Sequence, residues 1–276
     1  MSKLAKKYAG IYQNHKEGIV DLTQTCNHPL SFRYSEIFNA ALINATPHLG
    51  RISPGWTLNH NAPFYEAVAL LAFDDTYEEK LTKLKKSLSI FYEKFQPRNS
   101  LEWFNVSLKS SQLNVTPPWG SVLPWRARSS ESYQTAITEA ILKENLREGF
   151  SEGIESGWPM CGPMCSTKKA VEAKRLLDLV ISIETRGYIR NNGPDGDIKA
   201  TALIDKDEKS WKWLVTSGYH RACVLAALKY QSIPIRINNI IHVNHVHFWP
   251  HVQDGLYTAE EAEQVFFSIF EGRELN

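Results

Sequence analysis

Residues 211–237 read WKWLVTSGYHRACVLAALKYQSIPIRI and place a glycine, a histidine and an arginine at one turn. The pattern predicts a strand, a tight turn at Gly218, a short helix and a second strand. Gly218 permits a sharp turn because it has no Cβ atom. The backbone amides that follow would then point out of a helix N-terminus, where they favour a negatively charged group.

His220 and Arg221 would add side-chain donors beside these amides, and Ser217 would add a hydroxyl. An arginine can also bind two phosphate oxygens at once. The residue types therefore suit a phosphate site. The same residues are equally compatible with a plain glycine turn that carries a surface arginine and a hydrogen-bonded histidine.

The run from Ser217 to Arg221, followed by a short helix and by IPIR at residues 233–236, resembles the ParB/sulfiredoxin superfamily. Its members carry a Gly-x-His-Arg or Gly-x-Arg-Arg turn before a helix. The upstream segment RLLDLVISIETRGY looks like the superfamily's earlier helix, whose polar face also meets nucleotide phosphates. The resemblance covers roughly residues 168–237, about a quarter of the chain, and implies a ParB/sulfiredoxin-like nucleotide-binding domain.

Departures from the motif separate the three chemistries of this superfamily. Sulfiredoxins have a cysteine where this chain has Tyr219, so sulfinic acid reduction is not expected. ParB-type proteins bind CTP and DNA, with a second arginine where this chain has His220 and a later helix-turn-helix, which is missing here. The free-standing small-molecule kinases fit best. The resemblance thus implies an ATP- or ADP-dependent kinase that uses Mg²⁺ and acts on a sugar or amino-acid hydroxyl.

The resemblance also implies roles for individual residues. Nucleotide contacts are expected from the turn, Ser217 to Arg221, and from the upstream helix, where Arg175, Asp178 and Ser182 follow one another at helical spacing. Phosphoryl transfer needs a base near the acceptor hydroxyl. Candidate catalytic residues are His220 and the carboxylates of Glu172 and Asp178. The alternative for both acids is a solvated carboxylate on an amphipathic helix.

Two further groups of residues raise functional hypotheses. The loop PPWGSVLPWRARSSESY contains Trp125 and Arg126, which suit the binding of a small-molecule substrate, although its tryptophans are equally suited to packing. His245 and His247 would share one face of an extended strand, a geometry that suits a pair of metal ligands. A metal-dependent hydrolase is therefore one alternative function. A non-enzymatic nucleotide-binding or DNA-associated ParB-like regulator is another.

The fold class expected from these patterns is α+β. Helices are predicted over about residues 74–95, 131–148, 166–187 and 258–270, and the acidic turn DKDEKS suggests a hairpin between residues 198–204 and 212–217. Residues 1–60 read as loops and short helices, and a strand is expected within 100–115. The Gly- and Pro-rich segment near residue 160 divides a mainly helical region, 1–160, which would shape an acceptor site, from the nucleotide-binding domain, 161–276.

The overall composition makes several other classes of protein, such as nucleic-acid-binding and membrane proteins, less expected. The formal net charge is +1, which does not suit a nucleic acid backbone or an anionic membrane, so DNA is not an expected partner. No apolar run reaches the roughly 20 residues that cross a bilayer. The start, MSKLAKKYAG, has no apolar stretch after its lysines, and four cysteines do not make a disulfide scaffold. We therefore expect a cytoplasmic protein.

Overall fold

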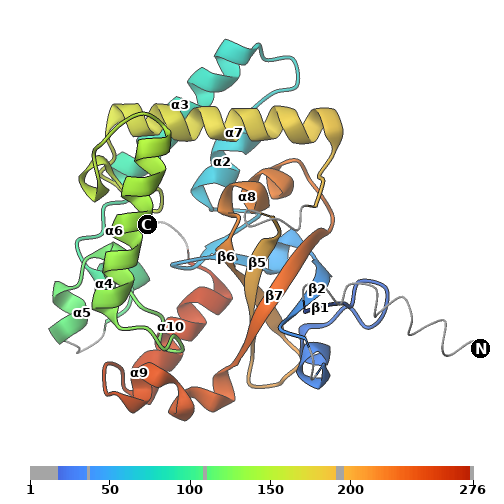
Figure 1. The fold of residues 1–276 in the computed structure, drawn as a ribbon, viewed down its shortest axis with the longest axis vertical. Helices are drawn as coiled ribbons and strands as arrows, with labels where there is room; N and C mark the ends of the chain where they lie inside the picture. The colour runs from blue at the N-terminus through green and yellow to red at the C-terminus, as the bar shows by residue number, and fades with distance from the viewer. Residues whose placement is uncertain (1–17, 36–37, 108–110, 191–195, 274–276) are drawn as a thin grey trace, which may run out of the picture.

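The computed structural model describes residues 18–35, 38–107, 111–190 and 196–273. Its centre is a mixed seven-stranded sheet with the order β1-β2-β7-β5-β6-β3-β4 (Figure 1). The strands are β1 (Ile19–Asp21), β2 (Ala40–Ala45), β3 (Gly50–Ile52), β4 (Trp56–Thr57), β5 (Ile198–Ile204), β6 (Trp211–Ser217) and β7 (Ile233–His242). With its helices this sheet gives the expected α+β class.

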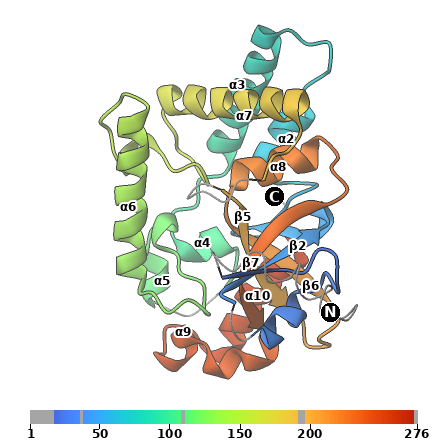
Figure 2. The ribbon, with the colours of Figure 1, turned by 45° about the vertical axis from the view of Figure 1, so that its right-hand side comes forward.

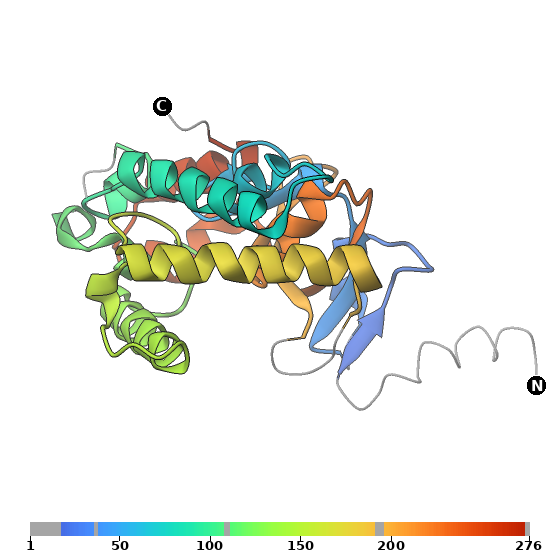
Figure 3. The same ribbon diagram turned by 90° about the horizontal axis from the view of Figure 1, so that it is seen from above.

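Four helices lie together above the sheet as Figure 1 is drawn. They are α2 (Pro63–Ala69), α3 (Tyr77–Lys94), α7 (Ser166–Arg186) and α8 (Tyr219–Ala227). Helix α8 packs on β5 and β6 and contacts α2 and α7, while α3 lies along α7, as the view from above shows (Figure 3). Helix α7 therefore packs on α8, the helix that starts where β6 ends.

The remaining helices flank or close the opposite side of the sheet. Helix α10 packs against β3 and η5, and α6 stands to one side of the molecule (Figure 2). The helices are α4 (Ser100–Phe104), α5 (Ser111–Val115), α6 (Ser130–Arg147), α9 (Pro250–Gln253) and α10 (Ala259–Glu271). Short 3₁₀ helices are η1 (Pro29–Tyr34), η2 (Pro47–Leu49), η3 (Pro118–Gly120), η4 (Ile154–Ser156) and η5 (Val243–Phe248).

The predicted long helices and the hairpin are confirmed. Thr258 and Glu261 form a capping box at the start of α10, and a second capping box, Thr76 with Glu79, starts α3. Helix α7 ends at Gly187 as predicted, and Cys165 is its N-cap. Strands β5 and β6 are antiparallel across the DKDEKS turn.

Two predictions for the first half of the chain were wrong. The described part of residues 1–60 contributes strands β1 to β4 instead of only loops and short helices. Around residues 100–115 the structure has the short helices α4 and α5 where a strand was expected. Strands β1, β3 and β4 have only two or three residues and leave almost no periodic signal, because pairing partners elsewhere in the chain hold them in place.

The sheet and its core draw on both sides of residue 160. Strand β2 pairs with β7, and β3 pairs with β6. One large cluster of buried side chains includes Trp56 and Trp103 from the first half and Trp213 from the second. The division at residue 160 into an acceptor region and a nucleotide region stays a prediction about function, and the hydrophobic core is continuous across it. Within the described part of the chain, no helix combines the length and the apolar character needed to cross a bilayer.

Candidate functional site

The turn at Gly218 has the backbone that the sequence predicted. Strand β6 ends at Ser217, Gly218 takes the left-handed conformation with φ of 86°, and α8 starts at Tyr219. A Cβ atom at position 218 would lie 3.2 Å from Nη2 of Arg221 and 3.3 Å from Cα of Ile198. Glycine is therefore favoured both by the backbone angle and by the close approach of Arg221.

The first amides of α8 are open. The N–H groups of Tyr219, His220 and Arg221 have no hydrogen-bond acceptor among the described residues, and Gly218 provides no side-chain cap. The first helical bond is donated by the amide of Ala222 to the carbonyl oxygen of Gly218, at 3.0 Å. Three adjacent donors at the positive end of a helix suit an anion.

Arginines gather on one side of this turn. A pocket of about 580 Å³ is lined by Arg186, Arg190 and Arg221, together with Ser182. Arg190 pairs with Asp197 at 2.6 Å, whereas Arg221 donates to the carbonyl of Gly196 and Arg186 donates to Ser182. Of the three guanidinium groups, Arg190 alone is paired with a carboxylate within the described residues, so the pocket carries excess positive charge.

His220 and Glu172 form a partly buried pair between α8 and α7. Nε2 of His220 lies 2.7 Å from Oε2 of Glu172, and the imidazole stacks on the ring of Phe64 with centroids 4.4 Å apart. The Glu172 side chain is 0% exposed, while that of His220 is 29% exposed. Of this pair, therefore, His220 is the member that a ligand can contact.

The carboxylate of Glu172 is held in its charged form. Burial alone would raise its pKa, but the hydrogen bond with His220 and the electrostatic interactions with His220, Arg175 and Lys168 outweigh this effect, so its pKa lies below the usual range. The Nζ atom of Lys168 is itself buried and has no hydrogen-bond partner among the described residues. For this lysine, in contrast to Glu172, burial lowers the pKa.

Arg175 lies away from the arginine-lined pocket. Its guanidinium contacts Glu144 of α6 and Glu148, the residue that follows α6, and lies 3.2 Å from Oε1 of Glu172. These pairs connect α6 to α7 and help to neutralise the buried charges. The predicted nucleotide contact of Arg175 is thus replaced by a structural role, since its guanidinium is already surrounded by three carboxylates.

Asp178 and Ser182 differ in their surroundings, since only Ser182 lines the arginine pocket. Asp178 forms an exposed pair with Lys174 at 2.6 Å. It lies about 120° around α7 from Glu172, because six residues do not complete two helical turns. Ser182 lines the arginine pocket, and its contact with a nucleotide stays a prediction. Of the two carboxylates proposed as bases, Asp178 faces away from the turn, and Glu172 is buried behind His220.

A second cavity, which we call the aromatic cavity, lies on the Tyr219 side of the turn. It has a volume of about 360 Å³, and its walls include Trp103, Trp158, Tyr133 and Tyr219. Arg126 and Arg128 also line it, as do the last residues of β6 before the turn. Burial raises the pKa of Tyr219, so its hydroxyl stays protonated. The turn therefore contributes Tyr219 to this cavity and Arg221 to the arginine pocket.

In the predicted substrate loop, Arg126 and Trp125 have different surroundings. Arg126 lines the aromatic cavity, and its role in substrate binding stays a prediction. Trp125 is only 6% exposed and packs against Trp249 and Phe266, with ring centroids 5.2 Å and 5.8 Å away. For Trp125 the packing alternative is therefore correct.

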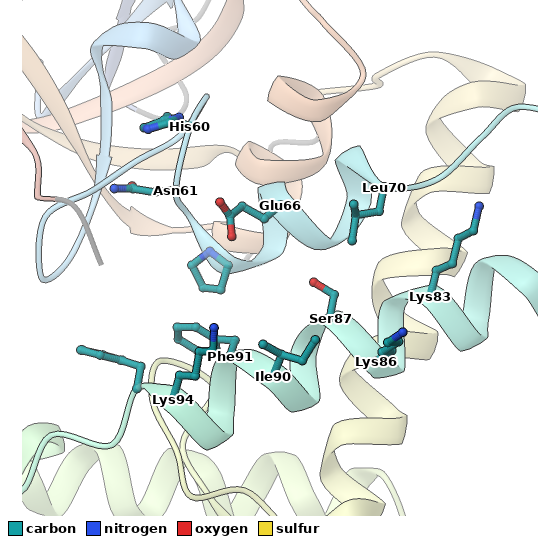
Figure 4. Close-up of a pocket in the computed structure, with 12 residues that line it drawn as sticks. His60, Asn61, Glu66, Leu70, Lys83, Lys86, Ser87, Ile90, Phe91 and Lys94 are labelled. Atoms are coloured by element: carbon teal, nitrogen blue, oxygen red, sulfur yellow. The ribbon is translucent and has the colours of Figure 1, made fainter. Parts of the chain in front are cut away.

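A larger groove between α2 and α3 lies apart from these groups (Figure 4). It has a volume of about 700 Å³ and is lined by apolar residues such as Leu70 and Ile90 and by Lys83, Lys86 and Lys94. Neither the turn nor the pair of Glu172 and His220 contributes a lining residue. Size alone therefore does not make this groove the better candidate site.

The histidine-rich segment does not have the geometry that a metal pair would need. His245 and His247 lie on the 3₁₀ helix η5 instead of on an extended strand. Both are exposed, and the ring of His245 stacks on His242 at 5.0 Å. The described residues contain no cluster of three or more histidine, cysteine or acidic side chains placed to hold a metal ion.

Several residues of this site were missed from the sequence. Phe64, Tyr133 and the two neighbouring arginines Arg186 and Arg190 come from three separate segments and carry no local motif. Comparisons with family models, with curated proteins and with solved structures give no match.

Proposed function

We propose that this protein is a nucleotide-dependent phosphotransferase that holds the nucleotide phosphates at the turn from Gly218 to Arg221. One observation carries the proposal: the amides of residues 219–221 have no acceptor among the described residues, and Arg221 lines a pocket together with Arg186 and Arg190. Phosphates need such a combination of backbone donors and guanidinium groups. The resemblance to the small-molecule kinases of the ParB/sulfiredoxin superfamily supports ATP or ADP as the donor.

In this proposal His220 is the base and Glu172 is its positioning residue. The acceptor hydroxyl attacks the terminal phosphorus of the nucleotide, and its proton passes to His220. The bond between that phosphorus and the bridging oxygen breaks, which leaves a phosphate ester and a nucleotide shortened by one phosphate. The buried carboxylate of Glu172, 2.7 Å from Nε2 of His220, stabilises the imidazolium that forms.

The residues of the turn provide little for the expected Mg²⁺ ion. The nearby carboxylates, Glu172 and Asp197, are both buried in ion pairs with His220, Arg175 and Arg190. Magnesium is commonly held by one or two carboxylates together with substrate phosphates. No carboxylate of the described site is free for that role, so no step here is assigned to a metal. A cytoplasmic location stays a prediction.

Replacing His220 tests the catalytic part of the proposal. We expect His220→Gln to lower the rate of phosphoryl transfer by about 100- to 10,000-fold, the usual contribution of a general base, with nucleotide affinity much less affected. The measurement is transfer of label from a terminally labelled nucleotide to a pool of small hydroxyl compounds. Binding of nucleotide by the wild-type protein without any transfer would instead favour a non-enzymatic nucleotide-binding module.

A further inference from the structure

The aromatic cavity has two positive charges at its edge that no carboxylate of the described residues neutralises. Arg126 and Arg128 are exposed and line the cavity. The guanidinium of Arg126 makes no hydrogen bond or ion pair within the described residues, and that of Arg128 donates only to Oγ of Ser132, at 3.3 Å. Two arginines left without acidic partners beside a cavity favour an anionic ligand.

Two phenol groups add donors to the same cavity. The side-chain hydroxyls of Tyr133 and Tyr219 have no hydrogen-bond partner within the described residues, yet both side chains line the cavity. Burial raises the pKa of each, and the nearby arginines only partly offset this effect, so both hydroxyls remain protonated. They can each donate a hydrogen bond to a hydroxyl or anionic oxygen of a ligand.

The aromatic side chains that line the cavity suit a ligand that contains a ring. The indoles of Trp103 and Trp158 lie with centroids 5.0 Å apart, and both line the cavity with Tyr133 and Tyr219. Aromatic walls of this kind pack against flat rings and against the apolar faces of sugar rings. The volume of about 360 Å³ falls within the range of ordinary small-molecule sites.

We propose that the aromatic cavity binds a hydroxylated ring that carries one anionic group, such as a sugar phosphate or a sugar acid. The anion pairs with Arg126 and Arg128, the ring packs on the aromatic walls, and ring hydroxyls accept hydrogen bonds from Tyr133 and Tyr219. Its role as the phosphoryl acceptor rests on the proposed function. Thr216 and Tyr219 line the cavity just before and after the glycine turn, so the cavity extends toward the phosphate site.

Calorimetric titration with four probes tests this inference. The probes are glucose 6-phosphate, glucuronate, glucose and inorganic phosphate. We expect at least one of the two anionic sugars to bind more tightly than both glucose and phosphate, because ring and anion are recognised together. In the variant with both Arg126→Gln and Arg128→Gln, affinity for that sugar should fall by about tenfold or more, since charge-assisted hydrogen bonds are lost.

Arg147→Gln provides the matched control, because Arg147 is exposed on the same helix as Tyr133 and makes no ion pair within the described residues. This variant should bind like the wild-type protein. Anionic sugars that bind no better than glucose, or that bind the double variant as well as the wild type, would overturn the inference. Nucleotide titration of the same samples separates the two proposals: sugar binding without nucleotide binding would contradict the proposed function alone.

Discussion

Glu172→Ala should destabilise the protein by about 3–5 kcal/mol, the usual cost of removing one partner from a buried ion pair. Glu172 is 0% exposed, and it contacts both His220 and Arg175. Its removal leaves the buried ammonium of Lys168 and the guanidinium of Arg175 with less compensating charge, and His220 loses its acceptor. The measurement is the free energy of unfolding from urea denaturation followed by far-UV circular dichroism.

Asp178→Ala is the matched control on the same helix. Asp178 pairs with Lys174 on the exposed side of α7, where solvent screens the interaction. This substitution should leave the urea midpoint nearly unchanged. Equal losses in the two variants would show that Glu172 has no special place in the folded state and would contradict the described pairing.

The same carboxylate gives the stability a defined pH dependence. The pKa of Glu172 is below its usual range in the folded protein, so the unfolded state binds the proton more readily. The stabilisation is therefore complete above the ordinary carboxyl pKa and is lost as the pH falls through the lowered folded value. In Glu172→Gln, which cannot ionise, the free energy of unfolding should fall less steeply on the acid side than it does in the wild-type protein.

Arg221→Ala should weaken nucleotide binding by about 100-fold or more, because a bidentate pair of charge-assisted bonds to phosphate is lost. Nη2 of Arg221 would lie 3.2 Å from a Cβ atom at position 218, so the guanidinium lies over the turn that the free amides follow. Arg221→Lys keeps the charge but removes the planar fork, and we expect it to recover only part of the affinity. Isothermal titration calorimetry with the preferred nucleotide measures both effects.

Arg33→Ala controls for the loss of one positive charge, since Arg33 is exposed on η1 and contributes to neither pocket of the site. It should bind nucleotide like the wild type. Thermal unfolding of each variant checks that the fold is intact, because Arg221 also donates to the carbonyl of Gly196. Unchanged affinity in a folded Arg221→Ala protein would remove the turn from the nucleotide site.

Local signals were enough to predict the framework around the turn. The apolar stripe of α7, the capping box of α10, and the glycine between β6 and α8 each act over a few residues, so the sequence specifies them directly. For the same reason the position of Gly218, His220 and Arg221 at a strand-to-helix turn could be predicted. Helical spacing also placed Glu172 toward the turn, where it meets His220.

Other features depend on contacts that no short segment encodes. Strands β1 to β4 exist because β2 pairs with β7 and β3 with β6. Arg175 was expected at the phosphates, but Glu144 and Glu148 approach it from a helix that begins 45 residues before it in the chain. The aromatic cavity likewise combines residues from five or more separate segments. Arg126 was a candidate binding residue from the sequence alone, whereas the aromatic residues that line the cavity were not.

The central claim is that the turn from Gly218 to Arg221 binds nucleotide phosphates, and a thermal-shift titration of the wild-type protein tests it most directly. ATP, ADP, CTP and GTP are each titrated, with and without Mg²⁺. A ligand that binds the folded state must raise the melting temperature as its concentration increases. We predict a saturable rise with at least one nucleotide, absent in Arg221→Ala. No rise with any of the four at millimolar concentration would contradict the claim.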